Sequence, residues 1–230
     1  MIAIRNLRQL YGGSQILWNL NLDVKTGSCT CIMGRNGVGK TTLLKCLMGL
    51  LPIAGGQILL DGLPIQQQQA YGRAALGIGY VPQGRDIFSS LTVEENLRIG
   101  LPCRSDGSRT IPDKIFALFP VLGEMLQRRG GDLSGGQQQQ LAIARALVID
   151  PKVLILDEPN EGIQPNIVRQ IGDVIMKLNQ DGLTVILVEQ KLAFARRVGS
   201  EFRLMEKGSV VASGAMTELS DELINRHLAV

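Results

Sequence analysis

One glycine-rich octapeptide constrains the fold of this chain more than any other feature. Gly34-Arg35-Asn36-Gly37-Val38-Gly39-Lys40-Thr41 follows an apolar run over residues 29–33 and precedes a helical pattern over residues 41–48. A strand, a loop of this composition and a helix, in that order, form a cradle of backbone N–H groups that approaches phosphate oxygens closely. A chance glycine-rich turn is the alternative, and the flanking strand and helix argue against it.

The cradle predicts a nucleotide site that works with Mg²⁺. In such a loop, Lys40 reaches the β and γ phosphates and the Thr41 hydroxyl ligates the metal ion. The candidate nucleotide-binding residues of this segment are Gly34, Arg35, Asn36, Gly37, Val38, Gly39, Lys40, Thr41 and Thr42.

Two adjacent carboxylates end a second apolar run. Residues 153–156 are apolar at successive positions, which is typical of a parallel strand buried on both faces, and Asp157 and Glu158 follow directly. We expect Asp157 to hold Mg²⁺ and Glu158 to polarise the water that attacks the γ-phosphate. Carboxylates at a strand end also serve as simple caps, and it is the phosphate loop upstream that favours the catalytic interpretation.

The composition is that of a folded globular protein. The 230 residues are 45% hydrophobic and 20% charged, and a net charge of +3 is too small to indicate a nucleic-acid surface. No apolar run approaches the roughly 18–20 residues of a membrane span, and the first residues lack a signal-peptide pattern, so we expect a cytoplasmic protein. The four cysteines form no Cys/His cluster in the sequence, which favours buried thiols over zinc or disulfides.

Strand and helix patterns alternate along the chain, which predicts an α/β fold with a mostly parallel sheet. The start of the chain departs from this pattern. There, Leu20, Leu22 and Val24 alternate with polar residues, and Asp61-Gly62 is a strong turn signal. We therefore expect an N-terminal antiparallel β layer beside the first helix.

The middle of the chain, residues 84–132, predicts an inserted α-helical subdomain. Thr92-Val93-Glu94-Glu95 is a capping box, and a helical stripe of apolar residues follows at Ile115, Leu118, Phe119 and Leu122. We expect a single domain over residues 1–230, in which residues 1–83 and 133–230 form the nucleotide-binding core with its β subdomain.

A third motif narrows the class of protein. Leu133-Ser134-Gly135-Gly136-Gln137 opens the helix that precedes Asp157 and is a second glycine-rich helix N-terminus suited to an anion. The three motifs, in this order and spacing, resemble the ABC ATPase family over essentially the whole chain. The resemblance implies the P-loop ABC ATPase fold and hydrolysis of ATP coupled to transport. It also implies head-to-tail pairing, in which Ser134, Gly135, Gly136 and Gln137 contact ATP bound by a partner subunit.

The same resemblance assigns roles to three further side chains. Tyr11 falls where the family stacks an aromatic ring on adenine, although an ordinary strand-end aromatic is the alternative. Gln83 falls on the glutamine that approaches both Mg²⁺ and the attacking water. Gln190 takes the place of the family's switch histidine; its amide can bind a phosphate oxygen but cannot become cationic.

Two departures from the common family pattern point to a subgroup. One is Gln190 within Val188-Glu189-Gln190, and the other is Gln164, where the family commonly has an aspartate. These forms resemble the cassettes of branched-chain amino acid, amide and urea importers, and residues 160–165 resemble most closely the second ATPase subunit of urea importers. We therefore expect uptake of urea across the inner membrane, with branched-chain amino acids or short amides as the alternative.

The importer resemblance also implies partners and a location. These are a second ABC ATPase subunit, identical or not, two transmembrane permease subunits and, indirectly, an extracytoplasmic solute-binding protein, at the cytoplasmic face of the bacterial inner membrane. No nucleic acid is expected. Ile87, Phe88 and Leu91 either contact a permease helix or form a small subdomain core.

Three other classes fit the motifs less well. Soluble ABC ATPases of DNA repair or translation usually carry long coiled-coil insertions or two cassettes in one chain. A nucleotide kinase needs a lid with clustered arginines and has no use for the motif at residues 133–137. A non-catalytic nucleotide-binding regulator does not need Lys40, Asp157 and Glu158 together.

Overall fold

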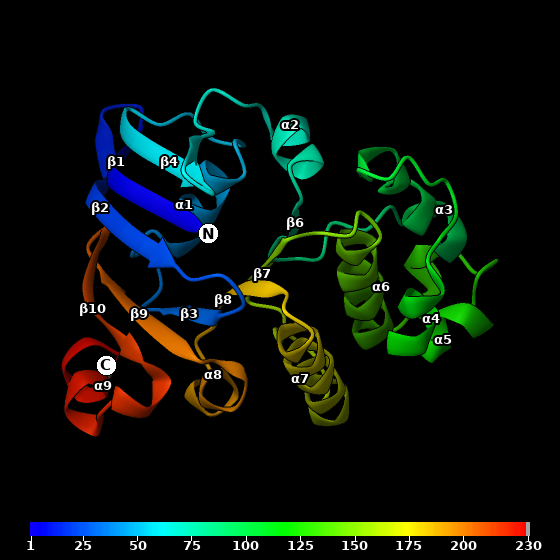
Figure 1. The fold of residues 1–230 in the computed structure, drawn as a ribbon. Coiled ribbons are helices and arrows are strands. Elements are labelled where there is room, and N and C mark those ends of the chain that lie inside the picture. The colour runs from blue at the N-terminus through cyan, green and yellow to red at the C-terminus, as the bar shows by residue number, and fades with distance from the viewer. Residues whose placement is uncertain (229–230) are drawn as a thin grey trace.

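The computed structural model describes residues 1–228 and contains two β-sheets (Figure 1). The larger sheet has the strand order β10-β9-β3-β8-β7-β6. Its strands are β10 (Ser209–Ala215), β9 (Glu201–Glu206), β3 (Cys29–Met33), β8 (Thr184–Val188), β7 (Val153–Asp157) and β6 (Ile78–Val81). Neighbouring strands from β9 to β6 are parallel, and β10 pairs with β9 in the antiparallel sense. The expected α/β fold with a mostly parallel sheet is confirmed.

A second, antiparallel sheet is formed by the N-terminal part of the chain. Its order is β2 (Ser14–Val24), β1 (Ile2–Tyr11), β4 (Gly55–Leu60) and β5 (Leu63–Pro64). Asp61 and Gly62, both with positive φ, make the tight turn between β4 and β5. The expected antiparallel layer is therefore present, and helix α1 (Lys40–Leu47) packs in the apolar core between the two sheets.

Helices cover the other face of the large sheet. They are α6 (Gly135–Leu147), α7 (Pro165–Gln180) and α8 (Leu192–Val198). Along β7, Leu154 and Leu156 face the core under these helices, while Val153 and Ile155 face the core around α1. Because both faces of the strand are covered, the sequence is apolar at every position rather than at alternate ones. Three further short helices are α2 (Ala70–Ala75), η3 (Met216–Glu218) and α9 (Asp221–His227).

Residues 84–132 form a group of short helices beyond α6, away from the antiparallel sheet (Figure 1). They are α3 (Val93–Arg98), η1 (Leu101–Cys103), α4 (Asp113–Leu118), α5 (Pro120–Glu124) and η2 (Gly130–Asp132). The predicted capping box is present at α3, where Glu95 N donates to Thr92 Oγ1 at 3.1 Å and Thr92 N donates to Glu95 Oε2 at 2.8 Å.

The predicted helical stripe is divided between two helices instead of lying on one. Phe119 ends α4 with φ of −133° and is followed by Pro120, the first residue of α5. A proline disfavours the helical conformation of the residue before it, which explains the break. Ile115, Phe119 and Leu122 are nevertheless buried in the same core cluster, so the apolar pattern identified the buried residues correctly.

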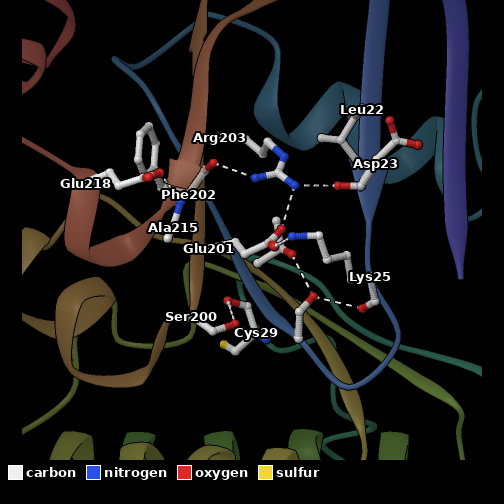
Figure 2. A network of polar contacts seen from close by, with 12 residues as sticks. Leu22, Asp23, Lys25, Cys29, Ser200, Glu201, Phe202, Arg203, Ala215 and Glu218 are labelled. Carbon is white, nitrogen blue, oxygen red and sulfur yellow. Dashed lines mark hydrogen bonds and ion pairs between the residues drawn. The ribbon is translucent and has the colours of Figure 1, made fainter.

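A polar network joins the two sheets where β2 meets β9 (Figure 2). Arg203 Nη2 donates to the Asp23 carbonyl oxygen at 2.7 Å and to Glu201 Oε2 at 2.7 Å, and Lys25 Nζ also pairs with Glu201. Arg203 and Glu201 are 7% and 8% exposed. The Arg203–Glu201 pair lies within β9, and the bond from Arg203 to the Asp23 carbonyl oxygen ties this strand of the large sheet to β2 of the antiparallel sheet.

Three of the four cysteines are buried, as the sequence analysis favours. Cys29, Cys31 and Cys46 are buried free thiols, and Cys103 is half-buried. Within residues 1–228, no helix is both long enough and apolar enough to pass through a bilayer.

Candidate nucleotide-binding and hydrolysis site

The phosphate loop runs from β3 to α1 and depends on its glycines. A Cβ atom at Gly34 would lie 2.4 Å from the Met205 carbonyl oxygen, so no side chain fits there. Gly37 and Gly39 have φ of 80° and 103°, a region that side chains strongly disfavour. The loop can therefore wrap tightly and leave its N–H groups directed at a ligand.

Lys40 begins α1 and bends back over this loop. It is 5% exposed, and its Nζ donates to the carbonyl oxygens of Gly34 at 2.8 Å and Arg35 at 2.9 Å. Burial lowers the pKa of Lys40, and the negative charges of Glu158 and Asp157 oppose that shift. The two carbonyl oxygens that accept from Lys40 are neutral, whereas phosphate oxygens are charged and accept hydrogen bonds more strongly. The Lys40 ammonium group is therefore placed to bind the phosphates of a nucleotide.

Asp157 ends β7 beneath the loop and has the properties of a metal-binding carboxylate. It is 1% exposed, and neither carboxylate oxygen has a hydrogen-bond partner. Burial raises the pKa of Asp157 to about 6, the Thr41 hydroxyl works against this shift, and the charge of Glu158 adds to it. A buried, unpartnered carboxylate beside a hydroxyl supplies the oxygen ligands that Mg²⁺ prefers, so the residues fit the ion.

Glu158 receives hydrogen bonds from two amides that come from distant loops. Gln190 Nε2 donates to Glu158 Oε1 at 2.5 Å, and Gln83 Nε2 donates to Glu158 Oε2 at 3.4 Å. Gln83 also donates to Glu161 Oε2 at 3.0 Å. Glu158 itself has φ of 49°, an unusual conformation for a residue with a side chain. The three residues that the sequence assigned to catalysis thus meet at one point.

These side chains line one open cleft of about 710 Å³. Of the predicted residues, the cleft is lined by Tyr11, Asn36, Gly37, Gly39, Lys40, Thr41, Thr42, Gln83, Glu158 and Gln190. Gly34, Arg35 and Val38 belong to the same loop but do not line the cleft, and the buried Asp157 does not line it either. Tyr11 lines the cleft and is 45% exposed, so its ring is accessible from the cleft.

The cleft also contains residues that the sequence analysis did not single out. Ile16, Glu161, Glu189 and Lys191 all line it. Glu161 lies in the turn after β7, and Glu189 and Lys191 flank Gln190. For Glu161, Glu189 and Lys191, proximity in sequence to Glu158 and Gln190 is the one available signal, because their residue types do not distinguish them from ordinary surface charges. Ile16 is an ordinary strand residue in the sequence and carries no such signal.

The residues Ser134 to Gln137 lie elsewhere. They line a separate cleft of about 430 Å³ together with Gly162 and Gln164. Ser134 caps α6, since Gln137 N donates to Ser134 Oγ at 3.3 Å and Ser134 N donates to Gln137 Oε1 at 2.9 Å. Within one copy of the chain, this motif and the phosphate loop are therefore not brought together.

A phosphate loop, two strand-end carboxylates and a glycine-rich helix start on this mixed sheet define an ATP-binding cassette, which hydrolyses ATP. Residues 17–161 match the family model described as ABC transporter, and the chain belongs to that family.

Relatives and solved structures agree with this assignment. The high-affinity branched-chain amino acid transport ATP-binding protein BraG of Pseudomonas aeruginosa is 39% identical over 212 residues, covering 92% of this chain and 91% of the relative. The probable branched-chain amino acid transport ATP-binding protein LivF of Archaeoglobus fulgidus is 39% identical, covering 95% and 94%. A dimeric, post-hydrolysis structure of the cassette MJ0796 with ADP and Pi superposes with a TM-score of 0.82 at 26% identity, covering 94% and 99%.

Proposed function

We propose that this chain is the ATP-hydrolysing subunit of an importer and that the imported solutes are branched-chain amino acids. The observation that carries the hydrolytic role is the convergence of Gln83 and Gln190 on Glu158, in the cleft that also holds Lys40 and Thr41. The solute class rests on the two relatives at 39% identity, which are both named for branched-chain amino acid transport.

Each residue of the cleft has a distinct task in this proposal. Lys40 and the loop N–H groups bind the phosphates, and Tyr11 stacks on adenine. Glu158 accepts a proton from the attacking water, while Gln83 and Gln190 orient that water and the carboxylate. Asp157, Thr41 and Gln83 would hold Mg²⁺, which neutralises charge that develops on the phosphate oxygens.

The separate lining of the two clefts supports a paired arrangement. We infer that Ser134, Gly135, Gly136 and Gln137 of one copy complete the nucleotide site of a second cassette, because they lie away from the chain's own phosphate loop. Gln164, which lines the cleft with them, would lie at the same interface. A single copy is then expected to hydrolyse ATP slowly.

The relatives favour branched-chain amino acids over urea as the solute. The urea hypothesis rests on residues 160–165 alone, whereas the 39% identity to both transport proteins extends over more than nine-tenths of the chain. The longer comparison carries more weight because it rests on most of the chain and not on six residues.

Transport requires partners outside this chain. ABC importer ATPases work with transmembrane permeases, and we propose two permease subunits, a second ATPase subunit and a solute-binding protein here, with the chain at the cytoplasmic face of the inner membrane. Phe88 supplies an exposed apolar contact for a permease helix, because it is 47% exposed, whereas Ile87 is partly buried against the core. Arg145 stacks over the Phe88 ring at 5.1 Å and holds it in place.

The test is ATP hydrolysis by the chain reconstituted with its permease subunits and a second ATPase subunit. Leucine, isoleucine, valine and urea are each supplied through the corresponding binding protein. Stimulation by the branched-chain amino acids is expected. Stimulation by urea alone would restore the urea assignment, and no stimulation by any solute would contradict the transport role.

A further inference from the structure

A buried carboxylate beside the catalytic cleft has no role in the chemistry described so far. Glu189 is 3% exposed and accepts hydrogen bonds with both oxygens. Its Oε1 accepts from the backbone N–H groups of Gln190 at 2.8 Å and Lys191 at 2.9 Å. Its Oε2 accepts from Asn160 Nδ2 at 2.7 Å. Three donors on one buried carboxylate make a strong, charge-assisted set.

This set connects the two loops that carry Glu158 and Gln190. Asn160 is 1% exposed and lies two residues after Glu158, while Glu189 immediately precedes Gln190. The backbone supports the same alignment, because Glu158 N donates to the Val188 carbonyl oxygen at 2.9 Å. Asn160 binds Glu189, the Glu189 carboxylate binds the backbone of Gln190, and the Gln190 amide in turn donates to Glu158. Together these bonds connect the loop after Glu158 back to the Glu158 carboxylate.

We propose that Glu189 and Asn160 are positioning residues that hold the Gln190 amide against Glu158 for ATP hydrolysis. The proposal rests on the catalytic roles assigned above to Glu158 and Gln190. A glutamine side chain has three rotatable bonds, so its amide stays in place only if its own backbone is fixed. Glu189 fixes that backbone by binding two consecutive N–H groups, and Asn160 fixes Glu189.

The pair allows a test by exchange of donor and acceptor. Asn160→Asp sets a carboxylate against Glu189 Oε2, where a donor now lies 2.7 Å away, and two buried carboxylates repel. Adding Glu189→Gln returns one donor and one acceptor: the new amide N–H donates to the carboxylate at position 160, and the new carbonyl accepts from the two backbone N–H groups. Glu189→Gln alone is tolerated better than Asn160→Asp, because the Asn160 amide can turn its unpartnered Oδ1 toward the new donor.

The measurement is kcat and KM for ATP of the full chain, with its melting temperature and nucleotide affinity recorded alongside. Asn160→Asp is expected to lower kcat about tenfold with little change in KM, and the double exchange to recover kcat to within about threefold of the unmodified chain. If Asn160 and Glu189 only stabilised the fold, Asn160→Asp would lower the melting temperature without lowering kcat at constant KM. Unchanged kcat in Asn160→Asp, or a folded double variant that binds ATP but recovers no kcat, would overturn the proposal.

Two further variants keep the test decisive. If Asn160→Asp does not fold, Asn160→Ala removes the donor without repulsion, and kcat is then expected to fall while KM holds; unchanged kcat again overturns the positioning role. Glu158→Gln, measured in parallel, separates this proposal from the one it rests on. Normal turnover by Glu158→Gln removes the catalytic assignment itself, whereas an inactive Glu158→Gln beside a fully active Asn160→Asp removes the positioning role alone.

Discussion

Asp157 is the residue where function and stability oppose each other most directly. Its pKa is about 6 in the folded chain, against 3.8 for an ordinary aspartate, because burial disfavours the charge. The stabilising contribution of the protonated form is therefore complete below about pH 4 and is lost as the pH rises through about 6. At neutral pH the charge costs the fold up to about 3 kcal/mol, which a bound cation would offset.

We accordingly predict that Asp157→Asn stabilises the chain without nucleotide or metal. At pH 7.5 its free energy of unfolding should exceed that of the unmodified chain by up to about 3 kcal/mol, and the difference should shrink toward pH 4. Chemical denaturation at the two pH values measures this. A difference that does not depend on pH would show that the carboxylate is not destabilised by its burial.

Gln190 leads to a prediction about pH dependence. An amide does not titrate, so the wild-type kcat should show no inflection from this position between pH 6 and 8. Gln190→His introduces a group with an ordinary pKa of about 6.5 next to Glu158, and we expect kcat to become pH-dependent in that range. Steady-state ATPase rates from pH 5.5 to 8.5 compare the two proteins. Superimposable profiles would mean that position 190 does not contribute to the reaction.

Local sequence identified most of the cleft but not its contacts. The residues of the phosphate loop are consecutive, and so are Asp157 and Glu158, so each group can be recognised directly in the sequence. The bonds from Gln83 and Gln190 to Glu158 join residues 75 and 32 positions apart, and only the folded sheet brings them together. Glu189 resembles a surface charge in the sequence and is buried in the structure.

At the scale of elements, the short helix α3 depends on its cap. It spans six residues, too few to be stable alone, and its N-terminal N–H groups are satisfied by the reciprocal bonds of Thr92 and Glu95. We predict that Thr92→Ala lowers the free energy of unfolding by about 1 kcal/mol. Thr110→Ala, which removes an exposed hydroxyl in a nearby loop, is the matched control and should cost less than about 0.5 kcal/mol. Equal losses in the two variants would show that the cap does not stabilise α3.

The sequence predicts elements that have a regular apolar pattern, but it does not predict elements whose residues are buried only through contacts with distant parts of the chain. The run over residues 29–33 matches β3 residue for residue, because a strand covered on both faces is largely apolar. The division of one expected stripe into α4 and α5 follows from Pro120. The sequence pattern does not predict the hairpin of β9 and β10, because β9 includes the charged residues Glu201 and Arg203, which are buried as a pair.

At the scale of the whole molecule, we expect a single substitution to destabilise the fold most at the link between the two sheets. Arg203 satisfies Glu201 and the Asp23 carbonyl at once, and its removal leaves Glu201 buried with one partner fewer. We predict that Arg203→Met lowers the free energy of unfolding by about 3 kcal/mol. Lys25→Met should cost less than about 1 kcal/mol, because the Lys25 side chain is 76% exposed and its ion pair is screened by solvent. Similar losses in the two variants would argue against a buried link.

Glu158→Gln measures the central claim most directly. The substitution keeps the shape of the side chain but removes the carboxylate that receives the amides of Gln83 and Gln190. ATP binding by the variant, followed with a fluorescent analogue, should equal that of the unmodified chain, and hydrolysis should fall at least about 100-fold, the usual contribution of a general base. Tight ATP binding with hydrolysis near the unmodified rate would contradict the account, because the convergence on Glu158 would then not be the catalytic centre.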